Sequence, residues 1–92
     1  MKLAEPKNRE WIDGLEDQLR TWKIILFNDE VNSFEDVIVL LVTYCKHTIM
    51  QAEQCAMIVH SSGKYAVKEG GREELEDIAN VLAENGLTVE IQ

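Results

Sequence analysis

The sequence predicts an α+β fold: a single two-layer domain in the order β-α-α-β-α-β, with a three-stranded antiparallel sheet packed on three helices. Two observations predict it. Residues 22–27, 64–69 and 87–91 are short segments with the apolar or alternating pattern of strands. Residues 34–46, 48–60 and 72–84 are longer and repeat apolar residues at helical spacing. The chain has 92 residues, which is the length of one domain rather than two.

The first strand and the first helix have clear boundaries. The strand reads Trp-Lys-Ile-Ile-Leu-Phe over residues 22–27, and the turn-forming residues Asn28 and Asp29 end it. Ser33 is a typical helix N-cap, with Asp36 as a weak capping-box partner. We therefore expect a helix over residues 34–46, with a wide apolar stripe that includes Val37, Ile38, Leu40, Leu41, Tyr44 and Cys45.

The second half of the chain is bounded by caps and glycines. Thr48 and Gln51 form a capping box that opens a helix, and we expect this helix to end at His60. A strand follows at residues 64–69, with Tyr65 and Val67 alternating with polar residues. Gly-Gly at 70–71 makes a turn, and acidic residues in the first turns of the next helix, 72–84, favour its dipole. Asn-Gly at 85–86 precedes the last strand.

Residues 1–21 are expected to form an N-terminal extension outside the domain of residues 22–92. The extension is charged, and Trp11, Leu15 and Leu19 lie on one helical face that Gly14 interrupts. One reading is a frayed tail with transient helix. The other is a tail that docks on a partner through Trp11 and Leu15.

The composition excludes several classes of function. The chain has 9 basic and 17 acidic residues, a net charge of −8, which disfavours nucleic acid and anionic membrane surfaces as partners. No segment approaches the roughly 18 apolar residues of a membrane span, and the N-terminus lacks the apolar core of a signal peptide. We expect a cytoplasmic protein.

Neither a metal site nor an active site is predicted. Cys45, His47, Cys55 and His60 have a spacing that fits no common zinc finger, and both cysteines lie on apolar stripes, so we expect buried reduced thiols. The sequence has no nucleophile elbow, no glycine-rich phosphate loop and no His-Glu-x-x-His motif. The chain is therefore expected to be no enzyme and to hold no cofactor; a zinc site or small enzyme is the weaker hypothesis.

Asn28, Asp29 and His60 form a third candidate set, at a strand end and a helix end. A free α-amino group is a cation with three N–H donors, and an amide oxygen, a carboxylate and a neutral imidazole nitrogen are its natural acceptors. The three residues supply one acceptor of each kind. From the pattern alone, an ordinary turn and a helix-terminal histidine are the better explanation, because these residue types are common at turns.

Three segments together resemble the Clp protease adaptor family, ClpS. Residues 22–30 resemble the signature strand and turn of these adaptors, and residues 31–37 resemble the start of their first helix. Residues 52–64, which contain Val-His-x-x-Gly, resemble the segment from their second helix to the hairpin. The spacing from Asn28 to His60 fits the family without a gap, and the resemblance covers about residues 22–92.

The resemblance implies an adaptor without enzymatic activity that needs neither cofactor nor metal. It would bind the N-terminal residue of a client protein, commonly Phe, Tyr, Trp or Leu, and hand the client to a Clp-type AAA+ unfoldase. Asn28, Asp29 and His60 would contact the α-amino group. The side-chain pocket would be shaped by Asn32, Phe34, Val37, Ala56 and Val59.

The resemblance also implies which parts of this chain would face the unfoldase, close the pocket and form the mobile tail. Glu73 and Glu74 would lie near the unfoldase, the last strand near Thr88 and Val89 would close the pocket, and residues 1–21 would be the family's mobile extension.

The sequence also departs from the family pattern. Many members have Met where this chain has Phe34 and Ala56, and Thr-Pro where it has Asn32 and Ser33. Residues 68–72 are also a shorter segment than in some adaptors. An alternative is therefore a non-enzymatic interaction domain of the same fold with a degenerate pocket, comparable with ribosomal stalk domains that bind partners through helix surfaces.

Overall fold

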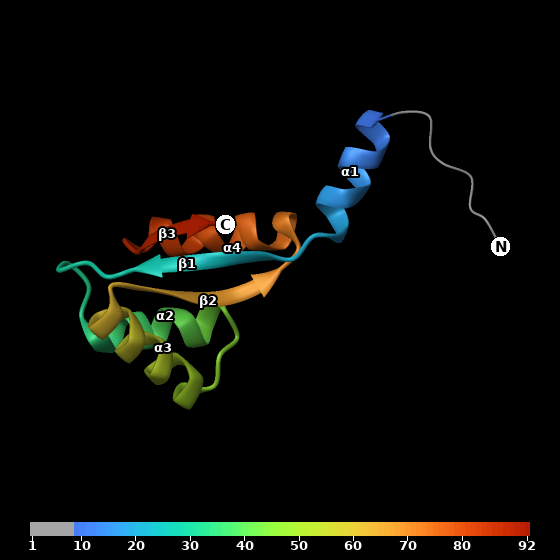
Figure 1. The fold of residues 1–92 in the computed structure, drawn as a ribbon. Helices are drawn as coiled ribbons and strands as arrows, with labels where there is room; N and C mark the ends of the chain where they lie inside the picture. Colours follow the sequence, from blue (N-terminus) through green and yellow to red (C-terminus); the bar gives the residue numbers. More distant parts are fainter. Residues whose placement is uncertain (1–8) are drawn as a thin grey trace.

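The computed structural model describes residues 9–92 and confirms the α+β fold (Figure 1). Its described elements are α1 (Arg9–Leu19), β1 (Trp22–Phe27), α2 (Phe34–Tyr44), α3 (Ile49–Ser62), β2 (Lys64–Gly70), α4 (Arg72–Glu84) and β3 (Thr88–Ile91). From β1 onward the order is the expected β-α-α-β-α-β. No helix in this part of the chain is both long and apolar enough to cross a membrane.

The sheet is antiparallel, with β1 at its centre in the order β2-β1-β3. Trp22 pairs with Gly70 at one end of β1, and Phe27 pairs with Lys64 at the other. Phe27 also pairs with Thr88 on β3. The turn after β1, the end of α3 and the start of β3 therefore meet at the same end of the sheet.

A β-bulge interrupts the pairing of β1 with β2. Ile24 pairs with Lys68 and the next residue, Ile25, pairs with Ala66, so Val67 is the extra residue. The His47 imidazole Nε2 lies 2.6 Å from the carbonyl oxygen of Val67. The bulge changes the expected alternation: Val67 is 4% exposed and belongs to the core, whereas Tyr65 is 41% exposed.

The core lies between one face of the sheet and the three helices α2, α3 and α4. Alternate residues of β1, Ile24 and Leu26, point into it because side chains in a strand alternate between the two faces. Fully buried members with no or almost no exposed surface are Ile24, Leu26, Leu41, Cys45, Ala52, Leu75 and Leu82. Both cysteines are free and buried, as expected.

Two helix ends differ from the expectation. α2 ends at Tyr44 instead of Lys46, because Lys46 has a φ of 60° and lies in the left-handed region. α3 continues past His60 to Ser62, because neither serine breaks the helix and Gly63, at φ 91°, supplies the left-handed C-cap. The capping box of Thr48 and Gln51 is present. Ser33 also caps α2, since its hydroxyl accepts from the Asp36 N–H at 3.1 Å.

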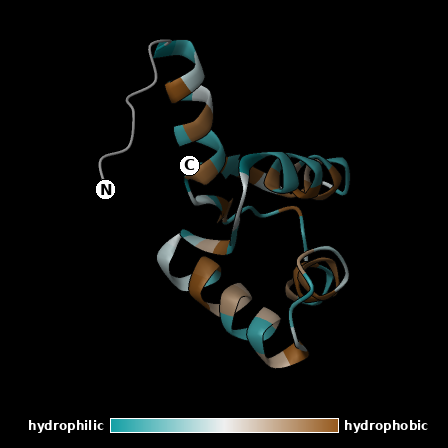
Figure 2. Cartoon of the chain, turned by 90° about the vertical axis from the view of Figure 1, so that its right-hand side faces the viewer, coloured by the Kyte–Doolittle hydropathy of each residue, from teal (hydrophilic) through white to brown (hydrophobic). Residues whose placement is uncertain are grey.

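The extension is helical over α1, whereas Pro6 and the rest of residues 1–8 lie outside the described residues. α1 projects away from the sheet and carries recurring hydrophobic residues along its length (Figures 1 and 2). None of its residues is buried. At its base, the Trp22 indole lies beneath the guanidinium groups of Arg20 and Arg72, at 4.2 Å and 4.7 Å from the ring centre.

Candidate functional site

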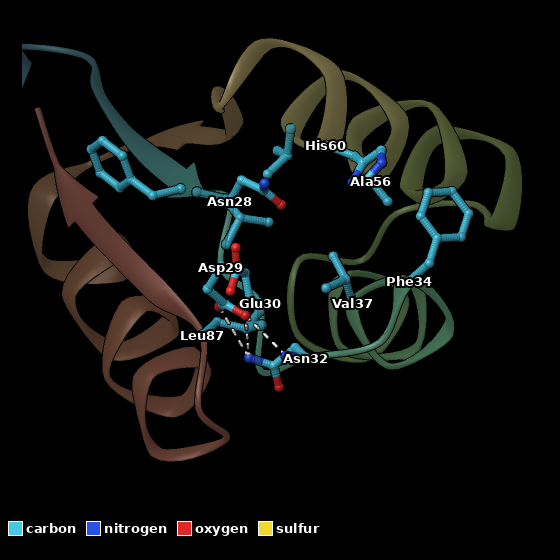
Figure 3. A pocket seen from close by; sticks show the side chains of 12 residues that line it. Asn28, Asp29, Glu30, Asn32, Phe34, Val37, Ala56, His60 and Leu87 are labelled. Atoms are coloured by element: carbon cyan, nitrogen blue, oxygen red, sulfur yellow. Dashed lines mark hydrogen bonds between the residues drawn. The ribbon is translucent and has the colours of Figure 1, made fainter.

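A pocket of about 620 Å³ lies where the turn after β1 meets α2, the end of α3 and the start of β3. Figure 3 shows side chains from all these segments facing the same space. Its lining is mostly apolar with a few polar groups, as is usual for binding sites. The lining residues are Leu26, Phe27, Asn28, Asp29, Glu30, Asn32, Phe34, Val37, Ala56, Val59, His60 and Leu87.

The structure brings Asn28, Asp29 and His60 together in this pocket. His60 lies in the last turn of α3, and Asn28 directly follows β1. The Asn28 backbone N–H donates to the Gly63 carbonyl at 2.8 Å, which joins the strand end to the helix end. Asn28 and His60 are exposed and Asp29 is half-buried, so all three are accessible from the pocket mouth.

The Asp29 carboxylate is held in a fixed orientation by its own turn. Its Oδ1 accepts hydrogen bonds from the backbone N–H groups of Val31 and Asn32, at 3.0 Å and 2.9 Å. Its Oδ2 accepts from the Asn32 amide at 3.1 Å. The Asn32 N–H is the main cause that lowers the pKa of Asp29, and the Asn32 amide and Val31 N–H add to it against the opposing effect of burial. The group is therefore an oriented anion at neutral pH.

The expected side-chain pocket residues all line the same cavity. Phe34 lies at its rim, 39% exposed, whereas Ala56 and Val59 are buried in its wall. The Asn32 side-chain amide makes a further hydrogen bond, to the Gly86 carbonyl oxygen at 2.8 Å.

Sequence reasoning missed four lining residues: Leu26, Phe27, Glu30 and Leu87. The last strand was expected to close the pocket near Thr88 and Val89. The lining residue there is Leu87, directly before Thr88, and neither Thr88 nor Val89 lines the pocket. Leu87 belongs to the apolar alternation that predicted β3, and that alternation was the available signal. Glu30 adds a second carboxylate to a rim that has no Lys or Arg among its lining residues.

The structure separates the residues of the alternative metal hypothesis. His60 lines the pocket, and His47 instead contacts the Val67 carbonyl. Cys45 and Cys55 lie in the core. Within residues 9–92 no group of three or more His, Cys, Asp or Glu side chains is arranged to hold a metal ion.

Glu73 and Glu74 lie in the first turn of α4, at the far end of the sheet from the pocket. The register places them there, because Gly70 pairs with Trp22 at the start of β1 and the pocket lies beyond Phe27 at its end. Both carboxylates are exposed and line a second hollow with Asp17 and Arg72.

Residues 17–90 match the family described as "ATP-dependent Clp protease adaptor protein ClpS". The chain belongs to the ClpS family. This family is one of adaptors of the Clp protease, not of enzymes. The match runs from residue 17 into β3 and includes the three core helices, so the predicted resemblance is confirmed.

Two ClpS relatives match over nearly the full chain. One is the ATP-dependent Clp protease adapter protein ClpS of Streptomyces coelicolor, 26% identical over all of this chain and 96% of the relative. The other, with the same description, is from Nocardia farcinica and is 27% identical over 97% of this chain and 84% of the relative.

A solved ClpS structure has the same fold. It is ClpS2 of Agrobacterium tumefaciens bound to L-phenylalaninamide. The TM-score is 0.68 at 20% sequence identity, over 79% of this chain and 95% of the other.

Proposed function

We propose that this chain binds the free N-terminal residue of client proteins in the pocket at the end of β1 and delivers them to a Clp-type AAA+ unfoldase. The observation that carries the proposal is the convergence of Asn28, Asp29 and His60 at the mouth of one pocket with an apolar interior. Such a pocket suits a ligand with a cationic head and an apolar side chain.

The polar rim fits an ammonium group. Asp29 is ionised and oriented, and its Oδ2 accepts a single hydrogen bond among the described residues, which leaves room for a donor from the client. The Asn28 amide oxygen and the His60 imidazole are further acceptors in the lining of the same pocket. We assign these three residues to the α-amino group.

The interior fits a large apolar side chain. Phe34, Val37, Ala56 and Val59 line it from two helices, and Asn32 lies beside the rim (Figure 3). The related ClpS2 was bound to L-phenylalaninamide, which has a free amino group and a benzyl side chain. Phenylalanine is therefore the first client residue to test.

The affinity expected from these contacts is useful but moderate. A hydrogen bond to a charged group contributes about 1.5–3 kcal/mol, and a large buried side chain contributes about as much. Ordering and association costs offset part of the sum. We expect a micromolar Kd, which corresponds to a net free energy of about −8 kcal/mol.

The delivery half of the proposal assigns the unfoldase contact to the far end of the sheet. Glu73 and Glu74 are exposed there, beside the base of α1. The extension, residues 1–21, would engage the unfoldase from the same side. A client in the pocket and the unfoldase at Glu73 would then be separated by the length of β1, and neither would block the other.

Fluorescent peptides that begin with Phe, Leu, Trp or Met test the binding half by anisotropy, with N-acetylated peptides as controls. We expect micromolar binding of at least one unblocked peptide and at least about tenfold weaker binding to its acetylated form, which lacks the charge and a donor. His60→Ala and Asp29→Asn should weaken binding, whereas the neighbouring exposed Ser61→Ala should not. Absence of binding to every unblocked peptide at hundreds of micromolar would favour the alternative, an interaction domain with a degenerate pocket.

Degradation of a reporter with an N-terminal Phe by the Clp unfoldase and its protease tests delivery. Glu73→Lys with Glu74→Lys should reduce degradation while peptide affinity stays at the wild-type value. If this double charge reversal leaves the degradation rate unchanged, the unfoldase contact lies elsewhere.

A further inference from the structure

Asn32 joins two turns that are far apart in sequence. Its side-chain amide donates to both carboxylate oxygens of Asp29, at 3.3 Å and 3.1 Å (Figure 3). It also donates to the Gly86 carbonyl at 2.8 Å. Asp29 lies in the turn before α2, and Gly86 lies in the turn between α4 and β3. The bond to Gly86 crosses 54 positions of the chain.

The chemistry of the bridge requires an amide. An Asn amide has two N–H donors, so one can serve Gly86 while the other is shared by the two oxygens of Asp29. An isosteric Asp at this position would have no donor and would place a second carboxylate against Asp29. A hydroxyl side chain has a single donor and cannot serve both turns at once.

The bridge also connects to the interior of the pocket. Gly86 has a φ of 90°, and an added Cβ there would lie 3.6 Å from the Asn32 amide oxygen. The next residue, Leu87, is buried and lines the pocket. A shift of the Gly86 carbonyl would therefore move an apolar wall of the pocket as well as the Asp29 carboxylate.

From this geometry we propose that Asn32 is a positioning residue for client binding: its amide holds the Asp29 carboxylate in the orientation that receives the client's ammonium group and ties it to the pocket wall at Leu87. This role rests on the proposed function. It differs from a direct contact with the client side chain, because the amide donors already serve Asp29 and Gly86.

Other titratable groups near Asp29 must be separated from the effect of Asn32. The pocket lining contains two, Glu30 from the same turn and His60 from α3, whereas the turn before β3 contributes the uncharged Leu87. Both remain in every Asn32 variant. A change in the Asp29 carboxyl seen in such a variant but not in a control is then due to Asn32.

The test compares Asn32→Ala with Asn85→Ala. Asn85 is a matched control, because its amide also donates to a backbone carbonyl at 2.8 Å, that of Val81, close to the same turn but outside the pocket lining. The readouts are the Kd for a peptide with an unblocked N-terminal Phe and the pKa of the Asp29 carboxyl from NMR titration. Asn32→Ala should weaken binding about tenfold and raise the pKa of Asp29, since a donor to its charged form is lost. Asn85→Ala should change neither.

A double-mutant cycle distinguishes positioning from a general loss of structure. If Asn32 acts through Asp29, Asn32→Ala should cause less additional loss on an Asp29→Asn background than on the wild type. An equal loss on both backgrounds, or an Asn32→Ala Kd within twofold of wild type, would overturn the proposal. Asn32→Ser is the second variant should Asn32→Ala not fold. Failure of the proposed function itself would appear as absent binding in the wild type, while the pKa readout would still test the effect of Asn32 on Asp29.

Discussion

The backbone N–H of Asn28 donates a hydrogen bond to the Gly63 carbonyl oxygen, 2.8 Å away. Gly63 is the C-cap of α3, and its own N–H donates to the Val59 carbonyl at 2.9 Å. One glycine therefore both ends the helix that carries His60 and fixes the strand end that carries Asn28. The relative position of the proposed amino-group acceptors depends on this contact.

Gly63→Ala should destabilise the protein by about 1 kcal/mol or slightly more and should weaken peptide binding. Gly63 has a φ of 91°, a conformation that costs an Ala residue roughly this much, although nothing lies within 4 Å of the added Cβ. Urea unfolding and peptide titration measure the two effects. Gly14→Ala is the control, since Gly14 lies within α1 with nothing within 4 Å of an added Cβ, and it should not lower stability. Equal stability of Gly63→Ala and wild type would contradict the strain argument.

Client binding should weaken at high pH as the client's α-amino group loses its proton, and at low pH as the Asp29 carboxylate gains one. The α-amino group loses its proton near pH 7.7–8.0. The pKa of Asp29 is lowered from 3.8, so the carboxylate persists at pH 4 and is lost only below it. The free energy of unfolding should depend on pH in the same direction. The contribution of Asp29 to stability is present above its unfolded pKa and is lost as the pH falls through the lower folded pKa.

Kd values measured from pH 3 to pH 9 test this dependence. The profile of His60→Gln is recorded beside the wild type, so that the contribution of the imidazole is separated from that of Asp29. An acid limb that survives unchanged in Asp29→Asn would show that another group controls it.

Ala56→Met should narrow the pocket and change the preference among client residues. Ala56 is 4% exposed and faces the cavity from α3, so a longer side chain there fills space that a large client residue would occupy. We expect the Kd for an N-terminal Trp to rise by about tenfold and that for Leu by less. Met57→Leu, on the exposed side of the same helix, is the control. An unchanged ratio of Trp to Leu affinity would show that Ala56 does not limit client size.

The Cys45 thiol should react very slowly in the folded protein. Burial raises its pKa to about 11, with a smaller opposing effect of Lys68, so about one molecule in a thousand carries the thiolate at pH 8. Because the folded pKa lies above the unfolded value of 9.0, this thiol favours the folded state less as the pH rises above 9. Labelling with a disulfide reagent at pH 8 should be slow in buffer and complete within seconds in denaturant. Fast labelling of both thiols in buffer would contradict their burial.

Local patterns predicted most of the fold. The capping box of Thr48, the N-cap of Ser33 and the glycine that ends α3 each bind groups a few residues away, so the sequence alone contains the whole interaction. The end of α2 was predicted two residues too late, because Lys46 adopts a left-handed conformation in the connection between α2 and α3. The next residue, His47, contacts the Val67 carbonyl, which lies 20 positions away in the sequence. The bulge at Val67 depends on pairing between strands and has no signal in the alternation of β2.

The candidate site was predicted where family spacing supplied the long-range information. Asn28, Asp29 and His60 were identified, but the pattern alone could not bring them together, because the contact depends on the bond from Asn28 to Gly63. Leu87 and the Gly86 carbonyl that accepts from Asn32 both belong to the α4–β3 connection. This connection reaches the pocket only when the sheet forms. These long-range contacts explain why sequence reasoning missed Leu87 and described Asn32 incompletely.

The exposure of α1 divides the chain into two units with different resistance to unfolding. An isolated helix of 11 residues is marginal in water, and none of the residues of α1 is buried. Its attachment includes the ion pair of Arg72 with Asp17, at 3.9 Å, whose side chains are 50% and 48% exposed and which therefore adds little. The amides of α1 should exchange with solvent far faster than those of β1, and α1 can unwind while the cooperative unit of β1 to β3 stays intact. A partner that binds α1 could therefore change its conformation without disturbing the structure of the pocket.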